Sequence, residues 1–165
     1  MIAIDHDPRD ARRLRDAFGA FATGVTVVTA VGADGRVGLT ANSLTSVSLD
    51  PPLLLFCPAR SASALPTLRS ARRFAVNVLA ADQAHVADRF ARRGVDRFAD
   101  ATWDDLDGLP VLAGALASFV CTLDAEHDGG DHVIVVGRVA AMRSHDGSDP
   151  LLYFRGAYRR VHVPT

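Results

Sequence analysis

The chain has 165 residues, with 18 basic and 19 acidic side chains and a formal net charge of −1. This length suffices for one domain with a sizeable core, and the near-neutral charge gives no electrostatic footprint for nucleic acid or an anionic membrane. All 18 basic residues are arginine. The absence of lysine excludes Schiff-base catalysis, a P-loop lysine and a Ser–Lys dyad.

Cysteine usage and hydropathy point to a cytoplasmic enzyme or binding domain. Cys57 and Cys121 each lie in an apolar run. This context predicts two small hydrophobic residues and neither a disulfide framework nor a CxxC metal motif. No apolar run reaches the roughly 18 residues that a membrane span requires, and the acidic N-terminus does not resemble a signal peptide. We therefore expect no membrane and no nucleic-acid partner.

Apolar periodicity and turn signals predict a mainly β domain with added helices. Residues 1–10 are polar and are expected to form a flexible tail before a single domain over 11–165. The Asp34-Gly35 pair is a strong hairpin signal. The expected elements are, in chain order, a helix over 12–21, strands over 25–31, from Val37 and over 53–57, a helix over 63–72 capped by Ser63, a strand over 74–79, a helix over 82–93 capped by Asp82, a loop with Trp103 and 108–110, and strands over 115–124, 132–142 and 151–154. Strands and helices do not alternate as in a Rossmann fold, so we expect a β-barrel with helical additions.

Hydroxyl and amide side chains crowd the stretch from Gly38 to Cys57, between apolar positions. An exposed edge strand explains some of them, but one pleated strand would place these residues on both of its faces. A buried polar group without a partner costs about 1–3 kcal/mol. We therefore interpret the stretch as one half-buried wall of a site for a large polar ligand. Ser61 and Ser63, near an expected helix N-terminus, form a candidate phosphate cradle.

The segment Gly129-Gly130-Asp131-His132 allows two interpretations. A hairpin turn explains both glycines and Asp131, because these residue types tolerate positive φ. The turn does not explain an imidazole at the start of an otherwise apolar strand, so His132 is a candidate functional residue. The six histidines match no zinc-ligand spacing, and we expect no metal site.

Several segments in sequence order resemble the flavin reductase domain family, the short-chain NAD(P)H:flavin oxidoreductases that serve two-component monooxygenases. They are FATGVTVVTA (21–30), GLTANSLTSVSLDPPLLLFC (38–57), the pair Ser61 and Ser63, RFAVNVL (73–79), GDHVIVVGRV (130–139) and PLLYFRGAYRRV (150–161). The resemblance extends over residues 14–161. It implies a six-stranded Greek-key split barrel that binds FMN and forms a homodimer.

The resemblance also implies which residues form the site. The flavin ring and ribityl chain would be lined by Thr40, Ala41, Asn42 and Ser43, continued by Thr45, Ser46, Ser48 and Leu49. Ser61 and Ser63 would approach the phosphate, and Tyr158 would close the pocket. Asp131 and His132 match the family's Gly-Asp-His motif on the nicotinamide side.

The reaction implied is hydride transfer from C4 of NADH or NADPH to N5 of FMN or FAD. His132 would position the nicotinamide, and the reduced flavin would pass to a partner monooxygenase. Two alternatives stay open at this point. The chain could be a split-barrel flavoprotein with tightly bound flavin that acts on another substrate, or a non-enzymatic flavin-binding module.

Overall fold

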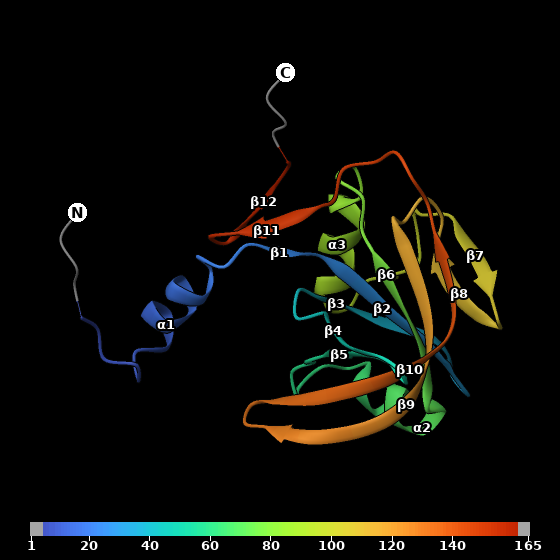
Figure 1. Ribbon diagram of the computed structural model, residues 1–165, viewed down its shortest axis with the longest axis horizontal. Coiled ribbons are helices and arrows are strands. Elements are labelled where there is room, and N and C mark those ends of the chain that lie inside the picture. Colours follow the sequence, from blue (N-terminus) through green and yellow to red (C-terminus); the bar gives the residue numbers. More distant parts are fainter. Residues whose placement is uncertain (1–4, 162–165) are drawn as a thin grey trace.

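The computed structural model describes residues 5–161 and is mainly β, as expected (Figure 1). Residues 1–4 of the expected tail and 162–165 of the expected domain lie outside the described residues. The helices are α1 (Ala11–Phe18), α2 (Leu65–Ala71) and α3 (Ala84–Ala91). The strands are β1 (Thr23–Gly24), β2 (Thr26–Gly32), β3 (Gly35–Ala41), β4 (Thr45–Leu49), β5 (Pro52–Phe56), β6 (Arg73–Val78), β7 (Trp103–Leu106), β8 (Leu109–Leu112), β9 (Ala117–Gly129), β10 (His132–Ser144), β11 (Leu152–Phe154) and β12 (Ala157–Arg159).

The main antiparallel sheet has the strand order β3-β2-β6-β9-β10-β5-β4. Its two edge strands, β3 and β4, are consecutive in sequence and are joined by residues 42–44 alone. In a flat sheet these edges would lie about 28 Å apart, whereas a connection of this length spans at most about 15 Å. The sheet must therefore curl until its edges approach. Because β3 and β4 do not pair with each other, the result is a barrel that is split at this seam.

The main sheet holds seven strands where six were expected. Three short strands form a separate sheet in the order β1-β11-β12, and β7 and β8 form a two-stranded hairpin. The sequence prediction of a loop around Trp103 is wrong, because Trp103 pairs with Leu112 across this hairpin. Its turn is Asp107-Gly108, both at positive φ. Asp-Gly is a strong signal for a hairpin turn, so the β7–β8 hairpin could have been predicted from the sequence.

Both predicted helix caps are wrong. Helix α2 begins after Ala64 without a side-chain cap, and the Ser63 hydroxyl instead accepts a hydrogen bond from Arg97 Nη1 at 3.1 Å. Helix α3 begins after Gln83 and not after Asp82. Gln83 Oε1 accepts a hydrogen bond from the Ala80 N–H at 3.0 Å, which holds the segment that precedes the helix.

Asn77 on β6 is the central polar residue of the interior, with no exposed surface. Its amide donates to the Val27 carbonyl at 3.0 Å, which ties it to β2. Its Oδ1 accepts the Leu112 N–H and the Ser118 hydroxyl, both at 2.9 Å, which ties it to β8 and β9. One buried amide therefore joins three strands around β6, with every bond it makes directed at a buried group.

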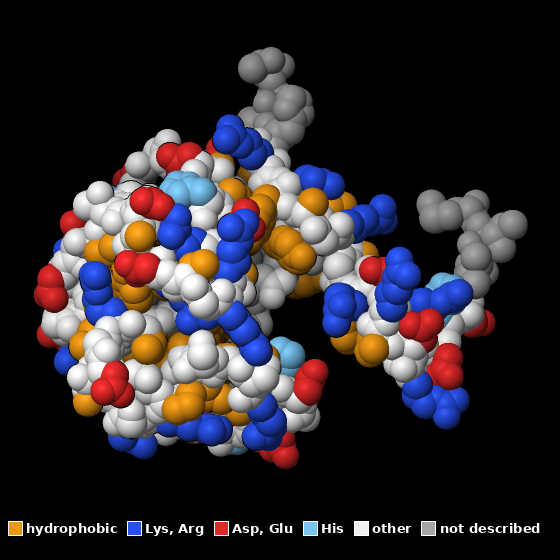
Figure 2. All heavy atoms as spheres, turned by 180° about the vertical axis from the view of Figure 1, so that it is seen from behind, with side chains coloured by type: hydrophobic (Ala, Val, Ile, Leu, Met, Phe, Trp, Pro, Cys, Tyr) orange, Lys and Arg blue, Asp and Glu red, His pale blue; other side chains and the backbone are white. Residues whose placement is uncertain are grey.

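Helix α1 stands away from the barrel (Figures 1 and 2). Asp10 caps it, accepting from the Arg12 and Arg13 N–H groups, but the helix buries none of its residues. Phe18 and Phe21 are 71% and 78% exposed. The expected apolar face of this helix exists, and nothing in residues 5–161 covers it. Among the described residues, no helix has the length and apolar character needed to cross a membrane.

Candidate functional site

A cleft of about 320 Å³ opens at the seam of the split barrel. It begins at the end of β3 and in the connection to β4, at Thr40, Ala41, Asn42 and Ser43. Segment 57–63 forms the facing wall and carries Ser61 and Ser63, and His132 lies at the start of β10. Three motifs that are far apart in the sequence thus line one cavity, whose volume falls within the range of small-molecule sites.

Helix α3 forms the remaining wall because it packs directly on β3. A side chain at Gly38 would place its Cβ 2.5 Å from the Phe90 ring, so only glycine leaves room for this ring. Phe90 also contacts Phe98 and Trp103, with ring centroids 5.1 and 5.5 Å away. This aromatic cluster holds the segment after α3, residues 92–98, beside the cleft.

Two arginines from that segment, Arg93 and Arg97, line the cleft and were missed in the sequence. Arg97 donates to the Ser63 hydroxyl at 3.1 Å and to the Arg92 carbonyl at 2.8 Å, and Arg93 donates to the Ser61 carbonyl at 3.4 Å. Within residues 5–161 neither guanidinium forms an ion pair with a carboxylate. Together with Ser61 and Ser63 they form a cationic end of the cleft, which suits a phosphate.

The hydroxyl groups of the β3–β4 connection are partly used by the protein itself. The Thr40 hydroxyl donates to the Ala87 carbonyl at 2.6 Å and so ties β3 to α3. The Ser43 hydroxyl accepts the Cys57 N–H at 2.9 Å, which bridges the seam to the segment after β5. The side chain of Asn42 is exposed and makes no hydrogen bond to the described part of the chain. Asn42 is therefore the side chain of this wall that stays available to a ligand.

His132 and Asp131 form a pair at the tip of the β9–β10 hairpin. Asp131 Oδ1 lies 2.7 Å from His132 Nδ1, and this hydrogen bond is the main cause that lowers the pKa of Asp131. An ionised carboxylate can only accept, so Nδ1 carries the proton. In a neutral imidazole this leaves Nε2 as an acceptor. His132 lines the cleft, whereas Asp131 does not.

The other predicted site residues lie outside this cleft. Thr45, Ser46, Ser48 and Leu49 follow β4 away from it, and Leu49 is 94% exposed. Within one chain these four residues do not line the cleft, and their part in the site stays a prediction. Tyr158 lines an adjoining hollow that shares Thr40 and Asn42 with the cleft. Burial, with the Asp88 carboxylate nearby, raises the pKa of Tyr158 to about 12, so it stays a hydrogen-bond donor.

Neither cysteine is set up as a nucleophile. Cys57 lines the cleft, but burial raises the pKa of its thiol. Burial raises the pKa of Cys121 to about 12 in the barrel interior. Both therefore stay protonated at neutral pH, and the reactive species of cysteine is the thiolate.

The fold and this cleft define a split-barrel nucleotide-binding domain, and the comparison with known families specifies it further. A sequence model described as "Flavin reductase like domain" matches residues 18–162. The chain belongs to this family.

Three relatives illustrate the match. An FMN reductase (NADH), SmoA, from Agrobacterium fabrum is 49% identical, over 92% of this chain and 86% of its own. The reductase subunit HsaB of a flavin-dependent monooxygenase from Rhodococcus jostii is 39% identical, over 96% of this chain and 82% of its own. The structure of the NADH:FAD oxidoreductase SgcE6 from Streptomyces globisporus, in complex with NAD and FAD fragments, superimposes with a TM-score of 0.93 at 41% identity, covering 97% and 98% of the two chains. The chain spans about half (48%) of the length of a probable flavin reductase from Rhizobium meliloti and 87% of that of an NADH-dependent FAD reductase from Streptomyces globisporus.

The residues of the cleft fit a flavin nucleotide. Its cationic end offers two guanidiniums without a carboxylate partner in the described part of the chain, which suits the phosphate. Its middle offers the exposed amide of Asn42 for ring heteroatoms, and Leu39, Phe90 and Pro58 for apolar contact.

Proposed function

We propose that this protein is an NADH-dependent flavin reductase that supplies reduced flavin to a monooxygenase component. The observation that carries the proposal is the seam cleft, where a cationic end, the Asn42 amide and His132 converge in a member of the flavin reductase family. The monooxygenase partner is supported by the name of the HsaB relative. We place the protein in the cytoplasm, because NADH and free flavin nucleotides are cytoplasmic metabolites.

Each part of the cleft has a distinct task in this proposal. Arg93 and Arg97, with Ser61 and Ser63, hold the flavin phosphate. Thr40, Ala41, Asn42 and Ser43 line the ring and ribityl chain, and Tyr158 closes the adjoining hollow. Bound FMN or FAD supplies the ring that accepts the hydride. The protein contributes orientation, which in favourable cases supplies about 7–11 kcal/mol of the barrier.

His132 would position the nicotinamide by a hydrogen bond with the carboxamide group of that ring. With the proton held on Nδ1 by Asp131, the free Nε2 of a neutral imidazole can accept a hydrogen bond from the carboxamide NH₂. Asp131 acts on the ring of His132 and not on the ligand, since it does not line the cleft.

Replacing His132 by alanine should raise KM for NADH by about 10-fold, the upper value for one neutral hydrogen bond. The Kd for FMN should stay within about two-fold, because the flavin-binding groups are untouched. Steady-state kinetics and flavin fluorescence titration measure both quantities. His127→Ala is the matched control, because His127 is an exposed histidine on the same hairpin and does not line the cleft. An equal loss of flavin affinity in His132→Ala would contradict the assignment.

The activity itself is tested by mixing the purified protein with NADH and free flavin and following absorbance at 340 nm. We expect rapid oxidation that requires added flavin. Turnover by a yellow protein without added flavin would instead support a flavoprotein with a fixed prosthetic group. The absence of oxidation would support a non-enzymatic flavin-binding module.

We also propose that two copies associate through α1. Its exposed apolar residues, with Phe21 after it, have no cover within residues 5–161, and exposed apolar patches mark interaction surfaces. The exposed Leu49 on β4 offers a second apolar contact, and β4 with its hydroxyl groups would then lie near a partner.

Sedimentation analysis should therefore give the mass of a dimer for the unmodified protein. The double variant Phe18→Asp with Phe21→Asp should shift the mass towards one chain, because charge placed in an apolar contact is disfavoured. Met142→Asp is the control, since Met142 is a similarly exposed apolar residue on β10. A monomer already in the unmodified protein would refute the proposal.

A further inference from the structure

The tip of the β9–β10 hairpin carries the Asp131–His132 pair, but little packing holds it in place. Strand β10 pairs with β5 from Val135 to Arg138, and backbone bonds to segment 58–60 hold residues 131–133, so the part of the tip beyond this pairing is residues 127–130. Residues 127–131 are all exposed. Such a segment buries little apolar surface, and its conformation depends on polar contacts.

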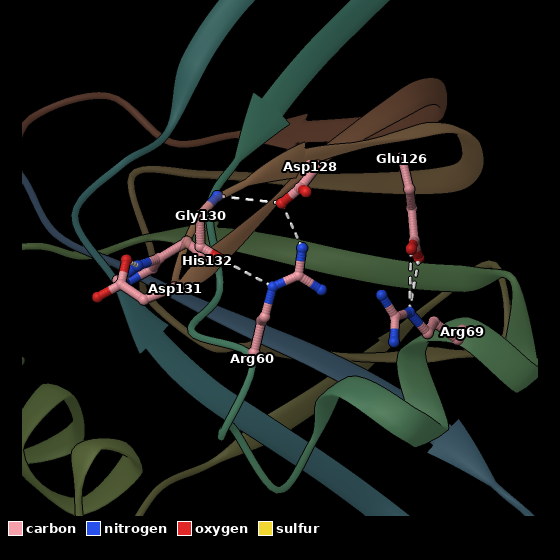
Figure 3. A network of polar contacts seen from close by, with 7 residues as sticks. All are labelled: Arg60, Arg69, Glu126, Asp128, Gly130, Asp131 and His132. Atoms are coloured by element: carbon pink, nitrogen blue, oxygen red, sulfur yellow. Dashed lines mark hydrogen bonds and ion pairs between the residues drawn. The ribbon is translucent and has the colours of Figure 1, made fainter.

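Arg60 supplies most of those contacts (Figure 3). Its Nε donates to the Gly130 carbonyl at 2.7 Å, and its Nη2 pairs with the Asp128 carboxylate. Its backbone N–H donates to the Asp131 carbonyl at 2.9 Å. Asp128 Oδ1 in turn accepts the Gly130 N–H at 3.1 Å. The Arg60 side chain thus holds Asp128 and Gly130, whereas the bond to Asp131 belongs to the backbone and remains in Arg60→Ala.

These contacts of Arg60 lie directly beside the cleft. Ala59, the residue before Arg60, forms a β-bridge with His132, and Ser61, the residue after it, lines the cleft. Arg60 itself does not line the cleft. Backbone bonds place the main chain of His132, whereas the orientation of its ring depends on Asp131 Oδ1, which contacts Nδ1 and belongs to the turn that the Arg60 side chain holds.

We propose that Arg60 is a positioning residue, which holds the Gly130–Asp131 turn so that His132 faces the nicotinamide side of the cleft. The effect of this proposal on catalysis rests on the proposed flavin reductase function. The Arg60 and Asp128 side chains are 47% and 81% exposed, so their ion pair adds little to global stability. Arg60 therefore orders the tip without being needed for folding.

The chain offers a matched control on the same hairpin. Arg69 on α2 pairs with Glu126 of β9, with Nε and Oε2 2.9 Å apart, and its side chain is as exposed as that of Arg60 (Figure 3). This pair holds β9 nearer the sheet and makes no contact with the turn. Arg69→Ala removes the same kind of interaction and leaves the Arg60 contacts in place.

The experiment compares Arg60→Ala, Arg60→Lys and Arg69→Ala. We expect Arg60→Ala to raise KM for NADH by about 3-fold, less than His132→Ala, since an exposed contact that only orients the ring has a small effect and the ring itself remains. The value of kcat, the Kd for FMN and the melting temperature should change little. Arg60→Lys should give an intermediate KM, because lysine keeps the charge but not the two-pronged geometry. Arg69→Ala should match the unmodified protein.

Asp128→Ala separates positioning from a direct contact between Arg60 and the nucleotide. If Arg60 acts through the turn, removing its carboxylate partner should also raise KM for NADH. If Arg60 touches NADH itself, freeing its guanidinium should leave KM unchanged or lower it, and that result would overturn the proposal. So would an unchanged KM in Arg60→Ala, or an equal loss of flavin affinity and melting temperature.

A measurement without substrate keeps this inference distinct from the proposed function. Amide exchange at Gly130, followed by NMR, should be at least about 10-fold faster in Arg60→Ala and unchanged in Arg69→Ala. If the unmodified protein does not oxidise NADH, the proposed function fails while exchange still decides whether Arg60 orders the turn. Equal exchange rates in Arg60→Ala and the unmodified protein would overturn the proposal in either case.

Discussion

Replacing Arg97 by alanine is expected to raise the Kd for FMN by about 10- to 100-fold and to leave the Kd for riboflavin within about two-fold. The range follows from the loss of charge-assisted hydrogen bonds, worth about 1.5–3 kcal/mol, since each 1.4 kcal/mol changes Kd tenfold. Riboflavin lacks the phosphate, so it should not sense the change. Fluorescence titration with both flavins measures the effect.

Three further variants sharpen this test. Arg92→Ala is the matched control, because Arg92 is a neighbouring arginine whose side chain does not line the cleft. Arg97→Lys should recover part of the affinity, because it keeps a positive charge near the phosphate. Ser63→Ala should weaken FMN binding less than Arg97→Ala, since it removes a neutral hydroxyl and leaves the charge of Arg97 in the cleft. If Arg97→Ala weakened riboflavin and FMN equally, a role in phosphate binding would be refuted.

Replacing Asn77 by leucine is expected to lower the free energy of unfolding by about 2–5 kcal/mol. The substitution keeps the number and branching of the side-chain heavy atoms, but it strands the Leu112 N–H and the Ser118 hydroxyl inside the barrel and removes the amide bond to the Val27 carbonyl. Each buried group left without a partner costs about 1–3 kcal/mol. Urea denaturation followed by circular dichroism measures the change.

Ser118→Ala provides the graded comparison for this prediction. It removes one of the three bonds that Asn77 makes, and it leaves the two backbone groups paired. We expect a loss of about 1 kcal/mol. A change of less than 1 kcal/mol in Asn77→Leu would mean that the three buried groups find other partners, contrary to the account given above.

Arg97 lines the cleft directly, whereas Asn77 affects it through the packing of the barrel interior. Arg97 reaches the cleft only because Phe90 of α3 packs on Gly38 and closes with Phe98 and Trp103. The β7–β8 hairpin that carries Trp103 is in turn tied to the barrel through Asn77 and Leu112. Loss of Asn77 should therefore loosen the arginine end of the cleft as well as the fold.

Local patterns in the sequence determined much of the fold. The β-branched run of β2 and the Asp34-Gly35 turn are where the sequence predicts them, because alternation and turn chemistry are local properties. Strands β9 and β10 form the predicted hairpin, but β9 continues to Gly129, beyond its predicted end at residue 124. The cap predictions at Ser63 and Asp82 were wrong because tertiary partners, Arg97 and the loop around Gln83, changed the local choice.

The family, the mainly β fold and the motifs that belong to one site can all be read from the sequence. How these motifs meet follows from the curvature of the sheet and from long-range packing. The β3–β4 connection is too short to span a flat sheet, so the sheet curls and leaves the seam in which Asn42, Ser63 and His132 face one cavity. Leu49 on β4 is exposed and lies outside this cleft, whereas the packing of α3 brings Arg93 and Arg97 to it. Such proximities depend on contacts between residues distant in sequence, which no local pattern records.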